Sequence, residues 1–367
     1  MILPLPSGLP DILPPMAAQE FIAIERLLAS FSAYGYSPVI PPIAEFESSL
    51  VMGTGEAASS QMFRVMDIIS HQMLALRSDM TAQIGRIAAN SLKDAARPLR
   101  LCYAGQTLRT TAEPLKTRRQ HTQIGIELFG ADNITHDAEI LTVAIDALAH
   151  LSLTDLSLDI SASSILADLL ENHPVERHAQ IKEAVARKDS AQLRTLNAPL
   201  VAAIVDASAP AAQAIETLEA IENAPPAISN ALDAIKSLCA FLHDKGLTIP
   251  ITIDLLEMRG FGYYDGLAYS LFLRNPACEI ARGGHYLNQN GEKAAGLTFY
   301  LDDVLFAFTP SESKKKLALA AKTSIATIHQ YQLEGYQTIL LHGDANPASA
   351  RLSGATHLFT DDTIIIL

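Results

Sequence analysis

The sequence is poor in the residues that build covalent or metal-held frameworks. It has no tryptophan and three cysteines, which are Cys102, Cys239 and Cys278. Their spacing matches neither a disulfide framework nor a zinc module, so we expect a cytoplasmic protein without a bound metal. No apolar run is long enough to cross a bilayer. The proline-rich segment 1–15 lacks the basic residues that begin a signal peptide.

Positive charge is also scarce. The 27 Lys and Arg residues are outnumbered by 40 Asp and Glu residues, which gives a net charge of −13. An acidic chain is a poor general binder of nucleic acid, because phosphate contacts require clustered lysine and arginine. The 367 residues are 49% hydrophobic and 18% charged, which predicts one large core and a smaller second unit.

Common signature motifs are missing as well. The sequence contains no GxxxxGK[ST], GxGxxG, HExxH or GxSxG pattern and no internal repeat. The best-known nucleotide-binding, metalloprotease and hydrolase classes therefore have no signature here. We expect no cofactor.

The segment His121–Gly130, HTQIGIELFG, shows the period-two alternation of a β-strand. Its aliphatic residues share one face, which suits a hydrophobic core. The other face carries an amide, a position without a side chain and a carboxylate: Gln123, Gly125 and Glu127. Glycine inside a strand often marks a close approach to the backbone. The pattern indicates one wall of a small polar ligand site, and an edge strand with a wet face is the alternative.

Two further segments add charge. The basic loop Arg109–Arg119, RTTAEPLKTRR, leads into this strand, and arginine binds carboxylate or phosphate through two parallel hydrogen bonds. Ser78 or Asp79 is a good N-cap for the helix that follows. From these residues alone, the alternatives are that the loop is a solvated hairpin tip and that Ser78 or Asp79 is an ordinary helix cap.

The remaining elements predict an α+β domain with a mostly antiparallel sheet. A first helix should follow Pro14-Pro15 and bury Phe21, Ile24, Leu28 and Phe31. Residues 63–76 suggest a hairpin, 135–151 a helix, and 162–246 an all-helical insertion between two strands of the sheet. We expect a main domain over residues 1–311. Residues 312–367 should form a small α/β unit with a helix, a strand, a short helix and a terminal strand.

The segment Arg259–Ser270, RGFGYYDGLAYS, places two adjacent tyrosines between glycines. In a regular strand, neighbouring side chains point to opposite faces. We therefore expect Tyr263 or Tyr264, but not both, to line a given pocket.

Taken together, these segments resemble the class II aminoacyl-tRNA synthetases, and within them the histidyl branch, over about residues 5–308. GYSPVIPPIAE, residues 35–45, resembles the family's first motif, which builds the dimer interface. LRLCYAGQTLR and RRQHTQIGIELFG resemble the second motif, with Arg109 at its phosphate-binding arginine. RGFGYYDG resembles the histidine-specific RGLDYYTG segment, and EIARGGHY resembles GGRYD.

The departures from the family pattern concern the nucleotide. Thr111 stands where the second motif has an acidic residue, and His285 and Leu287 replace the arginine and aspartate of GGRYD. In AGLTFYLDDVL, Asp302-Asp303 stands where the third motif has the arginine that grips the ATP γ-phosphate. A carboxylate there repels triphosphate. The tail after residue 311 is about half as long as the synthetase's anticodon-binding domain requires.

The amino-acid-binding residues of the synthetase pattern are kept, whereas its ATP- and tRNA-binding features are lost. This combination resembles the ATP phosphoribosyltransferase regulatory subunits, a non-catalytic family related to histidyl-tRNA synthetase. The resemblance implies a protein that activates a short catalytic subunit in the first step of L-histidine biosynthesis and mediates feedback inhibition by histidine. It implies self-association as a dimer within a hetero-octamer and no tRNA partner.

The resemblance also implies a histidine-binding site. Asp79 and Thr81, helped by Gln123, would hold the α-amino group, and Arg109 would meet the carboxylate. Glu127 would face either the imidazole or the amino group. Arg259, with Tyr263 or Tyr264, would close the site.

Two other functions remain open from the sequence. A true histidyl-tRNA synthetase is disfavoured by Asp302-Asp303 and by the short tail. A stand-alone amino-acid-binding protein or ligase, working without the phosphoribosyltransferase, is the other alternative. Association with a short phosphoribosyltransferase discriminates between these functions and the regulatory one.

Overall fold

A computed structural model describes residues 4–51, 60–112, 117–130, 132–162, 164–259, 262–308, 315–360 and 363–367. The chain divides into two compact units, Met1–Phe308 and Thr309–Leu367. The boundary expected near residue 311 falls within 309–314, outside the described residues. Among the described residues, no helix has the length and apolarity needed to span a membrane.

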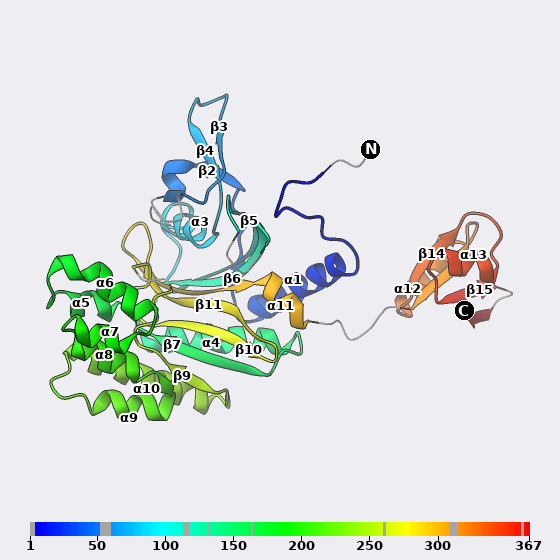
Figure 1. Cartoon of the computed structure of the whole chain (residues 1–367). Helices are drawn as coiled ribbons and strands as arrows, with labels where there is room; N and C mark the ends of the chain where they lie inside the picture. The colour runs from blue at the N-terminus through cyan, green and yellow to red at the C-terminus, as the bar shows by residue number, and fades with distance from the viewer. Residues whose placement is uncertain are drawn as a thin grey trace. The chain divides into compact units, whose positions relative to one another are not determined.

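A nine-stranded sheet runs through the first unit (Figure 1). Its strands lie in the order β1-β5-β6-β12-β11-β10-β7-β9-β8. All neighbours are antiparallel except the pairs β1–β5 and β7–β9, which confirms the mostly antiparallel sheet. The strands are β1 (Ser37–Pro38), β5 (Leu99–Leu108), β6 (Gln120–Phe129), β7 (Leu156–Ser161), β8 (Ala209–Pro210), β9 (Ile251–Ile253), β10 (Ala268–Arg274), β11 (Ala277–Leu287) and β12 (Lys293–Tyr300).

Helices α1 (Met16–Ala33), α4 (Ile134–Ala149) and α11 (Leu301–Ala307) border one side of this sheet, which we call the back face. The predicted aliphatic face of β6 packs there in the main core, with Ile124, Ile126 and Leu128 fully buried. The predicted stripe of α1 was partly wrong, because Phe21 is 73% exposed. Phe31 is buried as predicted, together with Ala23 and Leu27, since the apolar residues of the helix cover more than one face and packing selects among them.

The opposite side, the front face, is bordered by the short helix α3 (Thr81–Arg86) and the short π-helix η1 (Ile87–Ser91). A three-stranded sheet of β2 (Ala44–Phe46), β4 (Met73–Leu76) and β3 (Arg64–Met66) confirms the predicted hairpin, which projects from the unit (Figure 1). The expected cap takes a different form. Met80 is the N-cap residue, and Asp79 Oδ1 accepts a hydrogen bond from Thr81 N at 2.8 Å.

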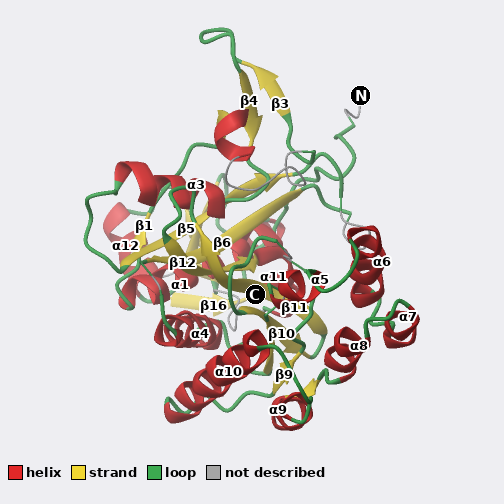
Figure 2. Cartoon of the chain, turned by 90° about the vertical axis from the view of Figure 1, so that its left-hand side faces the viewer, coloured by secondary structure: helices red, strands yellow, loops and turns green. Residues whose placement is uncertain are grey.

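The helical insertion forms as predicted between β7 and β9. Figure 2 shows its longest helix, α10, beside α4 beneath the sheet. The two-residue strand β8, which pairs with β9, lies inside the insertion and was not predicted. The helices are α5 (Ile165–Leu170), α6 (Val175–Ala186), α7 (Ser190–Thr195), α8 (Pro199–Asp206), α9 (Ala211–Glu219) and α10 (Pro226–Asp244).

The second unit holds a four-stranded sheet in the order β14-β13-β15-β16. The expected helices, middle strand and terminal strand are present, whereas β13 and β15 were not predicted. Its fully or nearly buried core includes Ala318, Ala350 and Leu358. The elements are β13 (Lys316–Ala320), α12 (Ile325–Leu333), β14 (Gln337–Leu341), α13 (Pro347–Leu352), β15 (His357–Thr360) and β16 (Thr363–Ile366).

Candidate functional site

A buried carboxyl group lies at the middle of the front face. The Glu127 side chain on β6 is 1% exposed. Its Oε2 accepts a hydrogen bond from the Tyr286 hydroxyl at 2.8 Å, and its Oε1 accepts one from Tyr103 at 3.3 Å. Burial raises the pKa of Glu127 to about 8, against the opposing effect of the hydrogen bond from Tyr286. The charge of Asp79 raises it further, so Glu127 holds its proton more firmly than an exposed glutamate does.

Two glycines on neighbouring strands make room for this carboxyl group. Gly296 of β12 pairs with Glu127, and a Cβ built on Gly296 lies 1.9 Å from Glu127 Oε2. Gly125 pairs with Tyr103, and a Cβ built there lies 2.4 Å from the Tyr103 hydroxyl. The glycine predicted to mark a close approach therefore admits a tyrosine hydroxyl from the adjacent strand.

A second carboxylate, Asp79, stands at the start of α3. Asp79 Oδ2 accepts a hydrogen bond from Gln123 Nε2 at 2.8 Å, and Gln123 Oε1 accepts one from Met80 N at 3.0 Å. Gln123 thus ties the helix start to β6 through both ends of its amide. The Thr81 hydroxyl lies 3.4 Å from that of Tyr103 and also lowers the pKa of Glu127 by hydrogen bonding. Four of the predicted residues, Asp79, Thr81, Gln123 and Glu127, therefore form one network.

Both adjacent tyrosines lie near these carboxylates, and the expectation that only one of them lines a given pocket stays a prediction. Tyr263 stacks on Tyr286 with ring centroids 5.4 Å apart, and Tyr264 meets Tyr263 edge-on at 5.2 Å. Burial, then the charges of Glu127 and Asp79, raise the pKa of Tyr263. The expectation assumed a regular strand, whereas the described residues 262–267 make turns before β10 begins.

The predicted Arg109 borders a neighbouring cleft with Gln123 and Tyr300. Burial raises the pKa of Tyr300 to about 12, and the charge of Arg109 opposes this rise. In the same cleft, Asp302 accepts hydrogen bonds from Arg118 at 2.7 Å and from His121 at 2.8 Å. Residues 113–116 of the basic loop lie outside the described residues.

Asp302 was expected to repel triphosphate. It lies in the first turn of α11, after the N-cap residue Tyr300. Burial acts to raise the pKa of Asp302, but hydrogen bonding to His121 and the charge of Arg118 outweigh it and leave the pKa lowered. The negative charge of Asp302 therefore compensates the positive charge of Arg118. Because Arg118 is already paired, it is less available to bind an anionic ligand.

Arg259 contacts carboxylates at the edge of the site rather than the Glu127 network. Its guanidinium lies 3.0 Å from Glu279 and 3.3 Å from Glu257. Glu279 also binds Arg282 through two hydrogen bonds, at 2.8 and 2.6 Å. Arg282 in turn acts electrostatically on Tyr264 and Tyr300, so Arg259 is linked to the site through Glu279 and Arg282.

The sequence analysis missed four residues that contribute to the site: Tyr103, Arg282, Tyr286 and Thr298. Tyr286 belongs to the quoted GGHY segment, which offered a usable signal. Tyr103 and Thr298 lie opposite Gly125 on its two neighbouring strands, and the Thr298 hydroxyl is 2.8 Å from that of Tyr103. Only the strand register reveals this arrangement.

The site offers two carboxyl groups, an amide and several hydroxyls in a partly dehydrated setting. Such groups bind a small ligand that carries N–H donors and positive charge. The described residues hold no cluster of three or more His, Cys, Asp or Glu side chains arranged to bind a metal ion.

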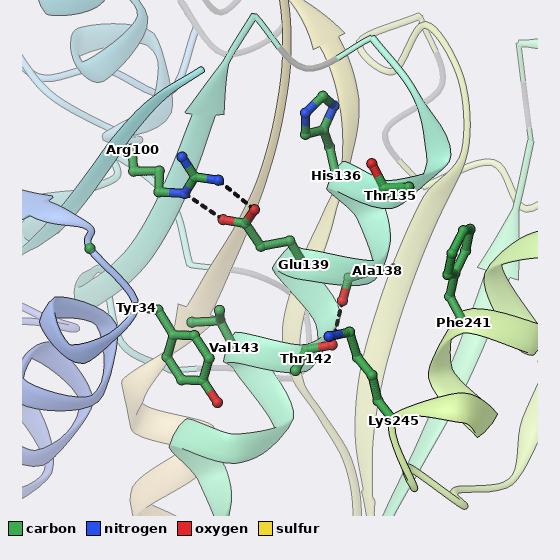
Figure 3. A pocket seen from close by; sticks show the side chains of 11 residues that line it. Tyr34, Arg100, Thr135, His136, Ala138, Glu139, Thr142, Val143, Phe241 and Lys245 are labelled. Atoms are coloured by element: carbon green, nitrogen blue, oxygen red, sulfur yellow. Dashed lines mark hydrogen bonds and ion pairs between the residues drawn. The ribbon is translucent and has the colours of Figure 1, made fainter. Parts of the chain in front are cut away.

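A larger cavity, of about 840 Å³, lies on the back face between the end of α1, α4 and α10 (Figure 3). Its acidic lining residue, Glu139, is already bound by Arg100 at 2.7 Å and by the Tyr36 hydroxyl at 3.0 Å. Apolar side chains such as Val143 and Phe241 form much of the rest. None of the predicted site residues lines this cavity.

Known proteins share this architecture. The sequence profile of the histidyl-tRNA synthetase family matches residues 8–304. The ATP phosphoribosyltransferase regulatory subunit of Paramagnetospirillum magneticum is 38% identical over 98% of this chain and 97% of its own length. The chain belongs to the ATP phosphoribosyltransferase regulatory subunit family. The part of this chain that is related to the synthetases is the part that the histidyl-tRNA synthetase profile matches, residues 8–304.

Solved structures agree on the fold. The structure of an ATP phosphoribosyltransferase regulatory subunit/histidyl-tRNA synthetase from Bacillus halodurans matches with a TM-score of 0.81 at 21% identity. That match covers 97% of this chain and 98% of the other. A chain of the ATP phosphoribosyltransferase (HisG:HisZ) complex from Thermotoga maritima matches with a TM-score of 0.60 at 20% identity, covering 77% and 97%. These likenesses confirm the class II synthetase-like α+β fold predicted from the sequence.

Proposed function

We propose that this protein is the non-catalytic subunit that activates a short ATP phosphoribosyltransferase in the first step of L-histidine biosynthesis. We further propose that it carries feedback inhibition by histidine. The observation that carries this proposal is the coexistence of the hydrogen-bonded network around Glu127 and Asp79 with a corner whose Arg118 is bound by Asp302. The full-length relation to named regulatory subunits supports it.

The pocket provides a complementary group for each part of free histidine. Asp79, held by Gln123 and backed by Thr81, suits the α-ammonium group. Arg109 is the partner for the carboxylate at the neighbouring cleft. Glu127 is the partner for either the imidazole or the ammonium group, both of which carry N–H donors.

Aromatic and arginine side chains complete the proposed site. The stacked pair Tyr263 and Tyr286 provides a wall for a flat ring next to Glu127. Tyr264 lies against Tyr263, and Arg259 reaches this wall through Glu279 and Arg282. Closure of segment 262–267 over the ligand is the step that we assign to these residues.

Regulation requires that histidine bind two states of the assembly with different affinity. Couplings between sites are typically about 1–3 kcal/mol, enough to change activity several-fold or more. We assign self-association as a dimer to residues 35–45, with two kinds of subunit forming a hetero-octamer in the cytoplasm. tRNA has no role in this proposal.

The experiment combines the purified chain with a short ATP phosphoribosyltransferase, and measures complex mass and the rate of ATP condensation with phosphoribosyl pyrophosphate. We expect a stable complex, a rate above that of the catalytic subunit alone, and inhibition by histidine. No association and no change in rate would refute the proposal.

A parallel assay of pyrophosphate exchange with histidine and ATP tests the synthetase alternative. Formation of histidyl-adenylate by this chain alone would replace the regulatory assignment with an enzymatic one. If histidine binds while both assays are negative, the stand-alone amino-acid-binding function is favoured.

A further inference from the structure

The back-face cavity between the end of α1, α4 and α10 has a volume of about 840 Å³ (Figure 3). Ligand cavities in proteins are typically about 300–1,000 Å³ in volume, so this one has room for a small organic molecule. It is separate from the amino-acid pocket, because none of the residues assigned to histidine lines it. The groups that line the cavity define the class of ligand that it can take.

The carboxylate in this lining already has its partners. Glu139 Oε1 accepts hydrogen bonds from Arg100 Nε at 2.7 Å and from the Tyr36 hydroxyl at 3.0 Å, and Glu139 Oε2 accepts one from Arg100 Nη2 at 2.7 Å. Burial acts to raise the pKa of Glu139, but the hydrogen bond and the charge of Arg100 outweigh it and leave the pKa lowered. Glu139 therefore stays ionised and has little capacity left for a cationic ligand.

The polar groups that remain are N–H donors from three elements. Lys245, at the end of α10, has no ion-pair or hydrogen-bond partner among the described residues. The backbone N–H of Asp132 donates to His136 Nδ1 at 3.2 Å, which leaves the proton of a neutral His136 on Nε2. Arg100 uses Nε and Nη2 for Glu139, so its Nη1 keeps two N–H groups. The lining therefore has a surplus of donors and one uncompensated positive charge, although the net charge of the chain is −13.

Apolar surface lies beside these donors. Val143 of α4, Phe241 of α10 and Tyr34 at the end of α1 all line the cavity. Phe241 is 38% exposed and Tyr34 is 41% exposed, so part of each ring is open to a ligand. Aromatic side chains contribute large apolar areas when a second ring packs against them. A ligand that meets both kinds of surface combines an anionic group with a flat apolar body.

We propose that this cavity is a second ligand site, which binds a small aromatic anion: a flat ring that carries a phosphate or carboxylate group. The anionic group accepts hydrogen bonds from Lys245 and Arg100, and His136 adds a neutral donor. The ring packs against Phe241 and Val143. Phosphate and carboxylate share this recognition, because both present anionic oxygens to N–H donors. A phosphate carries more charge and more acceptor oxygens, so it should bind more tightly.

The test is calorimetric titration of phenyl phosphate into the full chain, without histidine and without a catalytic subunit. Phenylacetate is the carboxylate arm, and the tighter of these two ligands identifies the anionic group. Inorganic phosphate has the charge without the ring, and benzyl alcohol has the ring without the charge. We expect saturable binding of phenyl phosphate, and binding of these two control ligands that is weaker by about tenfold or more.

Two exposed positions separate the charge from the ring. Lys245→Gln removes the uncompensated charge and should weaken phenyl phosphate by about threefold, because this lysine is exposed. Phe241→Ala removes apolar contact and should weaken phenyl phosphate by about threefold or more, with no effect on inorganic phosphate. Lys236→Gln is the matched control on the same helix. Its charge pairs with Glu219, so this variant should bind as wild type does.

Equal affinity in wild type, Lys245→Gln and Phe241→Ala would place the binding elsewhere and overturn the proposal. Benzyl alcohol that binds as tightly as phenyl phosphate would overturn the anionic class. Absence of saturable binding would also overturn it, and is the result expected if a second copy of the chain fills the cavity beside Gly35. Because the titration contains no histidine, its result is independent of whether the front pocket binds an amino acid.

Discussion

Two carboxyl groups of the first unit have opposite surroundings. Glu127 is enclosed by the neutral hydroxyls of Tyr103 and Tyr286, and its pKa is raised to about 8 by burial. Asp302 is bound by Arg118 and His121, and its pKa is lowered. A carboxylate without a cation favours a cationic ligand, whereas one that already has two partners does not.

The comparison shows that the two carboxyl groups differ in what they leave for a ligand. Arg118, which belongs to the basic loop, forms an ion pair with Asp302 at 2.7 Å. Asp302 therefore neutralises a cation of this corner.

The largest expected effect is on the pH dependence of stability. The pKa of Glu127 rises from 4.5 to about 8 on folding, so the folded state holds the proton more tightly than the unfolded state between these values. Stability should fall as pH rises through that window, by up to about 1.4 kcal/mol per unit, and level off above it. Urea unfolding of wild type and Glu127→Gln at several pH values measures this difference. Parallel curves would show that Glu127 ionises normally.

The next effect concerns binding. Glu127→Gln prevents this carboxyl group from ionising against a histidine N–H group, and a hydrogen bond to a charged partner contributes about 1.5–3 kcal/mol. We expect histidine affinity to drop by about ten- to a hundredfold in calorimetric titration. Glu216→Gln, on the exposed side of α9, is the matched control and should bind as wild type does. Unchanged affinity in Glu127→Gln would remove this residue from the site.

Gly296→Ala tests the space that the carboxyl group needs. The added methyl would lie 1.9 Å from Glu127 Oε2, so the side chain must move and the core strains by about 1–3 kcal/mol. Thermal unfolding should show this loss. Gly85→Ala, whose Cβ would make an ordinary 3.7 Å contact with Asn288, should be neutral or stabilising because alanine favours helix. Equal melting temperatures of the two variants would contradict the close approach.

The smallest effect is expected at the other carboxylate. Asp302→Asn breaks a partly exposed ion pair, which should cost less than about 1 kcal/mol. It frees Arg118, so tripolyphosphate should bind more tightly in calorimetry while histidine affinity stays unchanged. Asp168→Asn on α5 serves as the control. If tripolyphosphate binds wild type and Asp302→Asn equally, Asp302 is not what keeps anions out.

Much of the fold was predictable because its signals are local. Alternation in His121–Gly130 correctly assigned the core face and the polar face of β6, and helical composition delimited the insertion. Where apolar residues surround a helix, as in α1, periodicity alone could not choose the buried side. β13 and β15 were not predicted although they are as long as β14 and β16, which were, so strand length alone does not explain the difference.

The site was harder to predict because it combines several segments. Four of the proposed residues form one hydrogen-bonded network, but Arg259 instead pairs with Glu279. The two tyrosines were assigned to opposite faces on the assumption of regular backbone. Arg282 belongs to the quoted EIARGGHY segment, but its pairing with Glu279 and its proximity to Tyr264 and Tyr300 became apparent only in the structure.

The sequence by itself determined which side chains β6 presents to each side, because alternation is a property of the extended backbone. It also determined which residues are candidates for the proposed amino-acid site. Only the tertiary structure decided that Gly296 stands opposite Glu127 and that Asp302 reaches Arg118 across 184 residues of sequence. Strand register and side-chain pairing are set by how the whole chain packs, so no local segment contains them.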